Sequence, residues 1–414
     1  MTTETTTPRI QIERLSRRIQ QLAEIGALEG GGVSRLALTD EEGRGRDLVV
    51  SWMRELGLTV TVDRIGNVIA VRPAKDGSTE RPVLMGSHID TVATGGPYDG
   101  NLGVLGGLEV LETLADHNIE TERPVAVGFF TNEEGARFAP DMLGSGVHQG
   151  ALDLEVSLNT IGIDGTRVRD DLERIGYAGD EPCGDFRAAA YFELHVEQGP
   201  VLEEEGFTIG AVTGVQGISW TEWRFCGVSN HAGTTPMRLR HDAGLVASEV
   251  VCFVRDLATE FGEPQVATVG AMTFKPNLVN VIANDVTMTV DLRNTDDAVL
   301  KDAEARTAAF IQDAAARDGV TVTSRKLARF APVAFDPAQV DLVEATAKSL
   351  RHTVKRLPSG AGHDAQMFAP NCPTAMVFVP SARGISHNIQ EFTSEADIEA
   401  GANVLLHAVL AMAS

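Results

Sequence analysis

Residues 124–135 read PVAVGFFTNEEG, an apolar run that ends in two adjacent carboxylates. The run Pro124 to Phe130 predicts a buried strand, because short unbroken apolar segments are typical of strands covered on both faces. Adjacent side chains at a strand end point to different faces. Glu133 and Glu134 can therefore divide two tasks, in which one carboxylate binds a metal ion while its neighbour transfers protons. This pattern predicts an α/β sheet that carries the site of a metal-assisted hydrolase.

Histidines follow three other segments that predict buried strands. The segments are residues 82–87, 190–194 and 374–380, and the histidines are His88, His195 and His387. Histidine is a common metal ligand. The carboxyl ends of neighbouring strands are where open α/β sheets build their sites. The sequence therefore predicts that these histidines meet the Glu133–Glu134 pair.

Two aspartates accompany these strand ends. Asp99 lies in the turn-rich segment GGPYDGNLG, residues 95–103, whose glycines allow a close approach to a neighbouring strand end. A helical pattern of leucines follows and is expected to hold this turn in place. Asp90 lies two residues after His88, and its carboxylate is expected to accept the proton of the second ring nitrogen and fix the tautomer.

The combined set has the composition of a paired metal centre. It offers one bridging carboxylate, two histidines for one ion, and one histidine with one carboxylate for the other. Imidazole and carboxylate ligands without thiolates suit Zn2+, Mn2+, Co2+ or Ni2+. The four cysteines are widely scattered without C-x-x-C spacing, so the sequence predicts neither a disulfide framework nor a thiolate metal site. The chemistry expected of such a centre is hydrolysis.

Seven segments together resemble the M20-type amidohydrolases that act on ureido and carbamoyl amides. This group includes N-carbamoyl-L-amino-acid amidohydrolases, β-ureidopropionases and allantoate amidohydrolases. The segments occur in order, and the resemblance spans about residue 10 to the C-terminus. They are GSHIDTV (86–92), YDGNLG (98–103), NEEGARF (132–138), ELHVEQGP (193–200), HAGTTPM (231–237), GAGHDA (360–365) and SHN (386–388).

The resemblance implies a role for each matching residue. Two divalent ions per subunit are expected, with Zn2+ first and Mn2+, Co2+ or Ni2+ as alternatives. Glu133 would take a proton from the bridging water and return it to the leaving nitrogen, and Asp90 completes the catalytic set. Metal-bound water is acidic enough for a carboxylate base to suffice at neutral pH. The ligands of one ion would be His88, Asp99 and His195, and those of the other Asp99, Glu134 and His387, with Asp99 bridging.

The resemblance also implies residues that hold the substrate. His231 would donate to the oxyanion that forms at the carbamoyl carbon, and it would do so from the partner subunit of a homodimer. Arginine suits bidentate recognition of a carboxylate. A turn rich in glycine offers N–H groups that can cradle an anion. The expected substrate-binding residues are Gln198, Asn280, Arg293, Gly360, Ala361 and Gly362.

A chain of 414 residues is long enough for two domains, because single hydrophobic cores stop growing near about 250 to 300 residues. Residues 1–214 and 331–414 are predicted to form an α/β catalytic domain in two parts. Residues 215–330 instead follow the β-α-β-β-α-β order of a ferredoxin-like unit, with strands expected over 265–274 and 278–291. This inserted domain is expected to serve as a lid and as a dimerisation domain.

The net charge of −23 argues against nucleic acid or an anionic membrane as a partner. The N-terminus shows no basic segment followed by an apolar one, and no run approaches the roughly 18 apolar residues of a membrane span. These features predict a cytoplasmic enzyme with a small ureido or carbamoyl amino-acid substrate.

Three functions remain open at this point. Hydrolysis of the carbamoyl C–N bond of N-carbamoyl amino acids is favoured, with allantoate hydrolysis as a close variant. An aminoacylase or dipeptidase on the same scaffold is the second, and a metal-binding protein without catalysis is the third. His195 and His231 favour the carbamoyl class. Glu133 argues against a non-catalytic protein, because loss of the base is the simplest way to silence such a site.

Overall fold

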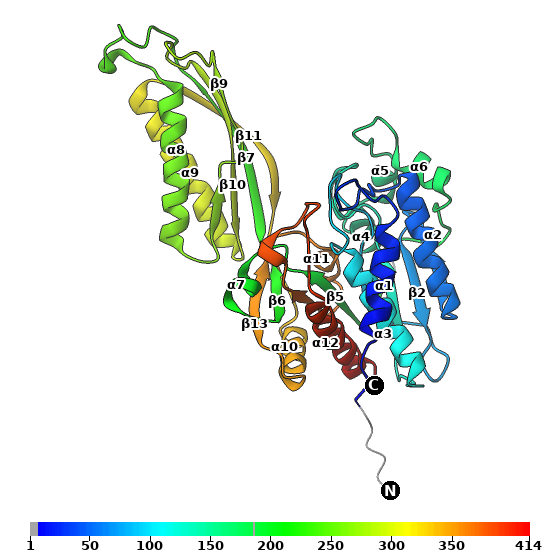
Figure 1. Cartoon of the computed structure of the whole chain (residues 1–414). Helices are drawn as coiled ribbons and strands as arrows, with labels where there is room; N and C mark the ends of the chain where they lie inside the picture. The colour runs from blue at the N-terminus through cyan, green and yellow to red at the C-terminus, as the bar shows by residue number, and fades with distance from the viewer. Residues whose placement is uncertain (1–6, 185–186) are drawn as a thin grey trace. The chain divides into compact units, whose positions relative to one another are not determined.

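The structure, a computed structural model, describes residues 7–184 and 187–414. The chain forms two compact units. The first comprises the described residues up to Gly214 together with Phe335–Ser414, and the second is Val215–Ala334. Figure 1 shows that each unit has its own sheet and its own helices. The second unit is therefore an insertion between two segments that fold together.

The larger sheet has nine strands and forms the core of the first unit. The strands are β1 (Thr59–Val62), β2 (Val68–Arg72), β3 (Val83–Ser87), β4 (Val125–Phe129), β5 (Ala190–Val196), β6 (Ile209–Val215), β12 (Val333–Ala334), β13 (Val354–Ser359) and β14 (Thr374–Val379). Their order is β1-β2-β4-β3-β5-β14-β6-β12, and β13 pairs with β6. The neighbours β4, β3, β5 and β14 are parallel and fully buried. Unbroken apolar strands of this kind are typical of parallel sheets covered on both faces.

Helices cover this sheet, and the two long ones that pack on its central strands are largely buried. They are α3 (Asn101–Asp116) and α12 (Glu395–Ala413), which pack against each other and against the central strands. Within the described residues, α12 is long and apolar enough to cross a membrane. However, 61% of its most apolar 18-residue segment is buried inside the structure, as in the core helix of a globular domain. The other helices are α1 (Ile12–Ala23), α2 (Asp40–Glu55), α4 (Leu143–His148), α5 (Leu154–Leu158), α6 (Val168–Ile175), α7 (Val201–Glu205), α10 (Pro337–Ser349), α11 (Asp364–Phe368) and the 3-10 turn η2 (Ala382–Gly384).

The second unit has a five-stranded antiparallel sheet with helices α8 (Ala243–Phe261) and α9 (Asp297–Asp318) against it. Its strands are β7 (Gly217–Cys226), β8 (Val266–Thr268), β9 (Met272–Lys275), β10 (Asp285–Asn294) and β11 (Thr321–Phe330), and η1 (Met237–Leu239) is a 3-10 turn. The order is β11-β7-β10-β8, with β9 also on β10. Burial alternates residue by residue along β10 because only one face of this sheet packs on the helices.

The chain order of the second unit is β-α-β-β-β-α-β, one strand more than the predicted β-α-β-β-α-β, and two strand predictions are wrong in detail. The strand expected over 265–274 is divided into β8 and β9. The strand expected over 278–291 begins only at Asp285. Leu278 to Asn284 form a loop whose first three residues are exposed. Apolar residues such as Val279, which is fully exposed, made this loop resemble a strand.

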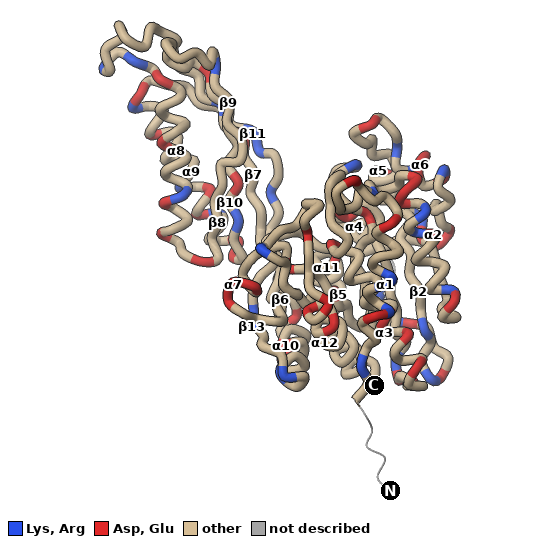
Figure 2. Tube along the Cα trace, viewed as in Figure 1, with Lys and Arg blue, Asp and Glu red and all other residues tan. Residues whose placement is uncertain are grey.

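Acidic and basic residues are interspersed over both units in Figure 2. Many of them form local ion pairs, such as Arg356 with Glu344 and Arg306 with Glu260. The excess of acidic residues is therefore distributed along the chain and not confined to one segment.

Candidate active site

The four parallel central strands end at one edge of the larger sheet, and the predicted ligands lie at that edge. The carboxyl ends of adjacent parallel strands meet, so side chains that follow them converge. His195 lies inside β5 and not after it, because the strand extends to Val196. The others follow their strands: His88 follows β3, Glu133 and Glu134 follow β4, and His387 lies in the loop after β14.

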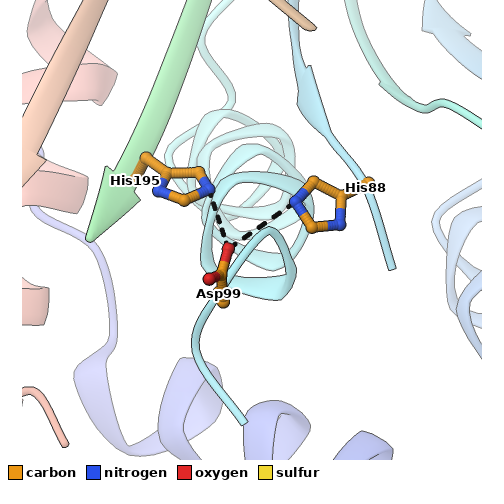
Figure 3. A group of neighbouring side chains, drawn as sticks. All are labelled: His88, Asp99 and His195. Atoms are coloured by element: carbon orange, nitrogen blue, oxygen red, sulfur yellow. Dashed lines mark ion pairs between the residues drawn. The ribbon is translucent and has the colours of Figure 1, made fainter. Parts of the chain in front are cut away.

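Asp99 lies between two histidine rings in Figure 3. Its Oδ1 is 3.2 Å from His195 Nε2 and 3.7 Å from His88 Nε2. Donor atoms around a tetrahedral zinc ion lie about 3.3 Å apart, given bonds of roughly 2.0 Å. All three side chains are buried. This first group has the spacing and the donor chemistry that a divalent ion needs.

A second group shares Asp99 with the first. His387 Nε2 is 3.4 Å from Asp99 Oδ2 and 3.2 Å from Glu134 Oε2. The two groups therefore use different oxygens of one carboxylate, as a bridging ligand would. Gln198 lies at the same place, where its Nε2 donates to Asp99 Oδ2 at 2.8 Å.

The ring protons of the two buried histidines are directed away from Asp99. His88 Nδ1 is 2.9 Å from the main-chain oxygen of Asp90, and His195 Nδ1 is 2.8 Å from that of Val196. Each Nδ1–H donates to a carbonyl, so each Nε2 keeps its lone pair toward Asp99. The Gly100 N–H also donates to His195 Nε2, at 3.2 Å. When neutral, each ring therefore carries its proton on Nδ1 and can offer Nε2 to an ion. Without an ion, the proton that His195 gains lies on Nε2, toward Asp99.

The role expected of the Asp90 carboxylate is wrong. Its backbone carbonyl, and not its side chain, holds the ring of His88, since the carboxylate is 3.9 Å away. The carboxylate instead accepts the N–H groups of Glu133 and Glu134, at 3.2 and 3.3 Å. Burial raises its pKa to about 6. Asp90 thus positions both segments, one with each of its polar groups.

Glu133 belongs to neither ligand group and lies beside the first. Its Oε2 is 3.3 Å from His88 Nε2, and the residue is 7% exposed. Burial, followed by the charges of Asp364 and Glu134, raises the pKa of Glu133 well above its ordinary value. Divalent ions in the cavity would oppose this shift. Glu133 is therefore a buried carboxylate beside the first group whose proton is held more tightly than usual.

The metal-free protein is expected to lose stability as the pH rises from 7 to 9. Burial alone would lower the pKa of His195, but its hydrogen bond with Asp99 outweighs burial and raises the pKa from 6.5 to about 9. The folded state binds this proton more tightly, so the stabilisation is complete below pH 6.5 and is lost as the pH rises through 9. The raised pKa of Glu133 changes stability in the same direction, because the folded state also binds that proton more tightly than the unfolded state does.

Urea unfolding of the metal-free protein across this pH range checks the prediction. Saturating Zn2+ should remove most of the slope, because the ion replaces the proton as the partner of Asp99. A free energy of unfolding that stays level or increases from pH 7 to 9 without metal would contradict it.

A cavity of about 110 Å³ contains both ligand groups. Of the predicted turn, Ala361 and Gly362 reach it. The Ala361 N–H already donates to Ser359 Oγ at 3.1 Å, so that amide is used within the turn. The cavity is lined by His88, Asp99, Glu133, Glu134, Asp141, His195, Gln198, Ala361, Gly362, His363 and His387.

Three predicted residues belong to the second unit. Asn280 and His231 are neighbours, since the Asn280 carbonyl accepts the N–H of Ala232, and both are exposed. His231 Nδ1 accepts the N–H groups of Gly233 and Thr234, at 3.0 and 3.2 Å. Its neutral ring therefore carries the proton on Nε2, where it can be donated to a ligand.

Arg293, the third of these residues, lies on β10. Its Nε and Nη2 donate to the carboxylate of Asp291, with Nη2 to Oδ2 at 2.9 Å. The guanidinium carbon is 5.8 Å from the ring centroid of Trp220. The charge of Arg293 is therefore held at one place on its strand by a carboxylate and an aromatic ring.

Two buried arginines behind the site had no recognisable sequence signal. Arg35 is fully buried and donates to the Ile89 carbonyl and to Asn101 Oδ1, both at 2.8 Å. Arg46 donates to Thr131 Oγ1 at 3.1 Å. Each ties a ligand-bearing segment to the N-terminal part of the chain. An isolated arginine in a sequence is read as a surface residue, so these contacts could be found only in the structure.

Comparison with known proteins agrees with this geometry. The model of peptidase family M20/M25/M40 matches residues 84–411. An N-carbamoyl-L-amino-acid amidohydrolase of Rhizobium meliloti is 43% identical over 97% of this chain and 96% of its own length. One from Geobacillus stearothermophilus is 39% identical over 98% and 99%. An allantoate amidohydrolase of Bacillus subtilis is 32% identical over 94% of each chain.

A solved structure is similar over nearly the whole fold. The amidase of the hydantoinase/carbamoylase family from Burkholderia multivorans has a TM-score of 0.96 and 48% identity, and the match covers 98% of each chain. Because the match covers 98% of this chain, it extends over both units and over the edge of the larger sheet where the candidate ligands lie. The chain belongs to the M20/M25/M40 peptidase family.

Proposed function

We propose that this protein hydrolyses the carbamoyl C–N bond of N-carbamoyl amino acids. The observation that carries the proposal is the pair of ligand groups that share Asp99, with Glu133 beside them and outside both. Its relatives of 43% and 39% identity bear the name of that activity. The substrate would be a small ureido or carbamoyl amino acid, and the reaction would release ammonia, carbon dioxide and the amino acid.

The two groups would hold two divalent ions, Zn2+ first and Mn2+, Co2+ or Ni2+ as alternatives. When bound, such ions supply positive charge and acidify water. Glu133 takes a proton from the attacking water and then delivers it to the leaving nitrogen. Asp90 keeps Glu133 and Glu134 in place through their backbone N–H groups. His231 donates its Nε2 proton to the oxyanion at the carbamoyl carbon.

The second unit would act as a lid and as the dimerisation domain of a homodimer. His231, Asn280 and Arg293 all lie on this unit, whereas every residue that lines the cavity lies on the first. A site that needs both sets requires the lid to close, which also excludes water from the reaction. We propose that His231 serves the partner subunit in this way, and that the enzyme works in the cytoplasm.

Arg293→Ala is expected to raise the KM for carboxylate substrates about 10- to 100-fold, because a charge-assisted, bidentate hydrogen bond is lost. Arg325→Ala is a matched control: Arg325 lies on β11 of the same sheet and pairs with Glu222. A neutral amide analogue should be affected far less than the acid. Equal losses on acid and amide would rule out a carboxylate clamp.

Allantoate is the second candidate substrate, since an allantoate amidohydrolase is among the relatives. An ammonia-release screen tests the proposal, with metal-reconstituted protein and N-carbamoyl α-amino acids, N-carbamoyl-β-alanine and allantoate. N-acetyl amino acids and dipeptides belong in the same screen, with release of the free amino acid as the readout. Preference for the acyl or peptide substrates would indicate an aminoacylase or dipeptidase. Turnover of none of these substrates by protein that holds its ions would favour a binding protein.

A further inference from the structure

Glu391 is a buried carboxylate that connects two ligand-bearing segments far apart in the chain. It lies in the loop after β14, four residues beyond His387, and is 5% exposed. Its Oε1 accepts the N–H groups of Tyr98 and Asp99, both at 3.0 Å. Its Oε2 is 3.2 Å from the Ser386 hydroxyl, whose single proton is shared with Asp99 Oδ2 at 3.0 Å. One side chain therefore bonds to the residue before His387 and to the backbone of Asp99 itself.

Glu391 packs closely against the turn that carries Asp99. A Cβ atom at Gly96 would lie 2.4 Å from both Cβ and Oε1 of Glu391, so this turn accepts the carboxylate only because residue 96 is glycine. Both carboxylate oxygens already accept hydrogen bonds, and Glu391 belongs to neither ligand group. Glu391 thus contacts the ligand-bearing segments without belonging to either candidate group.

His387 is the ligand that most needs such support. Its side chain is 50% exposed, whereas those of Asp99 and Glu134 are 5% exposed. It has a positive φ of 53°, which a residue other than glycine adopts at some energetic cost. It also lies on a loop, while the histidines of the other group lie at the ends of β3 and β5.

We propose that Glu391 is a positioning residue that joins the Asp99 turn to the His387 loop and so sets the affinity for the ion held by Asp99, Glu134 and His387. This inference rests on the proposed two-ion centre. The other group depends on it less, because His88 and His195 are held by main-chain carbonyls and by their strands. Asp99 belongs to both groups, so Glu391 supports the ion held with His387 more strongly than the other, but not exclusively.

Equilibrium dialysis of the full chain against buffered Zn2+, followed by elemental analysis, tests the inference. Glu391→Ala is expected to lower the affinity for one of the two ions about 10- to 100-fold, as removal of a hydrogen-bond partner of a metal ligand typically does. The affinity for the other ion should stay within a few-fold of the wild-type value. Glu203→Ala is the matched control, because Glu203 also bonds to this loop, at the N–H of Arg383, but has no hydrogen bond to Ser386 or to the Asp99 turn.

Two conservative variants separate the effect of side-chain length from that of negative charge at position 391. They remain informative if Glu391→Ala does not fold. Glu391→Gln keeps the reach and an acceptor oxygen for both N–H groups, so it should bind two ions nearly as wild type does. Glu391→Asp keeps the charge but is too short, so it should behave as Glu391→Ala does.

Three outcomes would overturn the inference. The first is that Glu391→Asp binds two ions with wild-type affinity. The second is that Glu391→Gln and Glu391→Asp lose the same amount of affinity for the ion. A wild-type chain that binds one ion at saturation would overturn the two-ion centre as well. Wild-type binding of two ions together with either of the first two results would contradict only the role of Glu391, and would leave the proposed function standing.

Discussion

Glu133→Gln is expected to lower kcat about 10²- to 10⁴-fold, the usual contribution of a general acid-base group. The amide has the size of the carboxylate but cannot take a proton from water at neutral pH. Glu133 belongs to neither ligand group, so the variant should keep its ions. Steady-state kinetics with elemental analysis of the same sample separates loss of the base from loss of metal.

Glu197→Gln is the matched control for that substitution. Glu197 is also buried and lies near the site in sequence, but its carboxylate accepts the N–H groups of Val201 and Leu202 at the start of α7. Its activity should stay close to wild type. A Glu133→Gln variant that holds both ions and retains most of its turnover would contradict the assignment of Glu133 as the base.

The ligand edge could be predicted from the sequence because its signals are local. Each histidine or glutamate of the site follows an apolar run, and parallel strands bring their carboxyl ends together without further information. Asp99 could be added because a glycine-rich turn and a helical pattern surround it.

Contacts between distant segments could not be predicted in the same way. The hydrogen bond between Glu391 and the Asp99 N–H spans 292 positions, and no pattern near either residue announces it. Asp90 shows a second limit of sequence-based prediction. The sequence correctly predicts that Asp90 contacts His88, but the contact is made by its backbone carbonyl and not by its carboxylate. A two-residue spacing brings a backbone carbonyl and a carboxylate to the same region, and only the local backbone geometry decides between them.

His231→Ala is expected to lower kcat about 10²- to 10³-fold, as loss of one oxyanion donor typically does. The hydrogen bonds from Gly233 and Thr234 to Nδ1 fix the proton on Nε2, so the neutral ring is a donor. His231→Gln should recover part of the loss, because its amide can donate. His241→Ala is the control, since His241 lies on the same unit and its Nδ1 is 2.9 Å from the Asp318 carbonyl.

The same variant tests whether His231 acts across the interface of the proposed homodimer. If it does, each active site combines Glu133 of one subunit with His231 of the other. Glu133→Gln and His231→Ala are each expected to be nearly inactive, yet a hybrid dimer would contain one site with both residues intact. Random mixing of the two in a two-fold dimer should therefore restore about a quarter of wild-type activity. Activity can recover only if the two variants exchange subunits. Co-purification of the two variants, each with a different affinity tag, measures that exchange independently. Exchange without recovered activity would contradict action across the interface and would assign His231 to its own subunit.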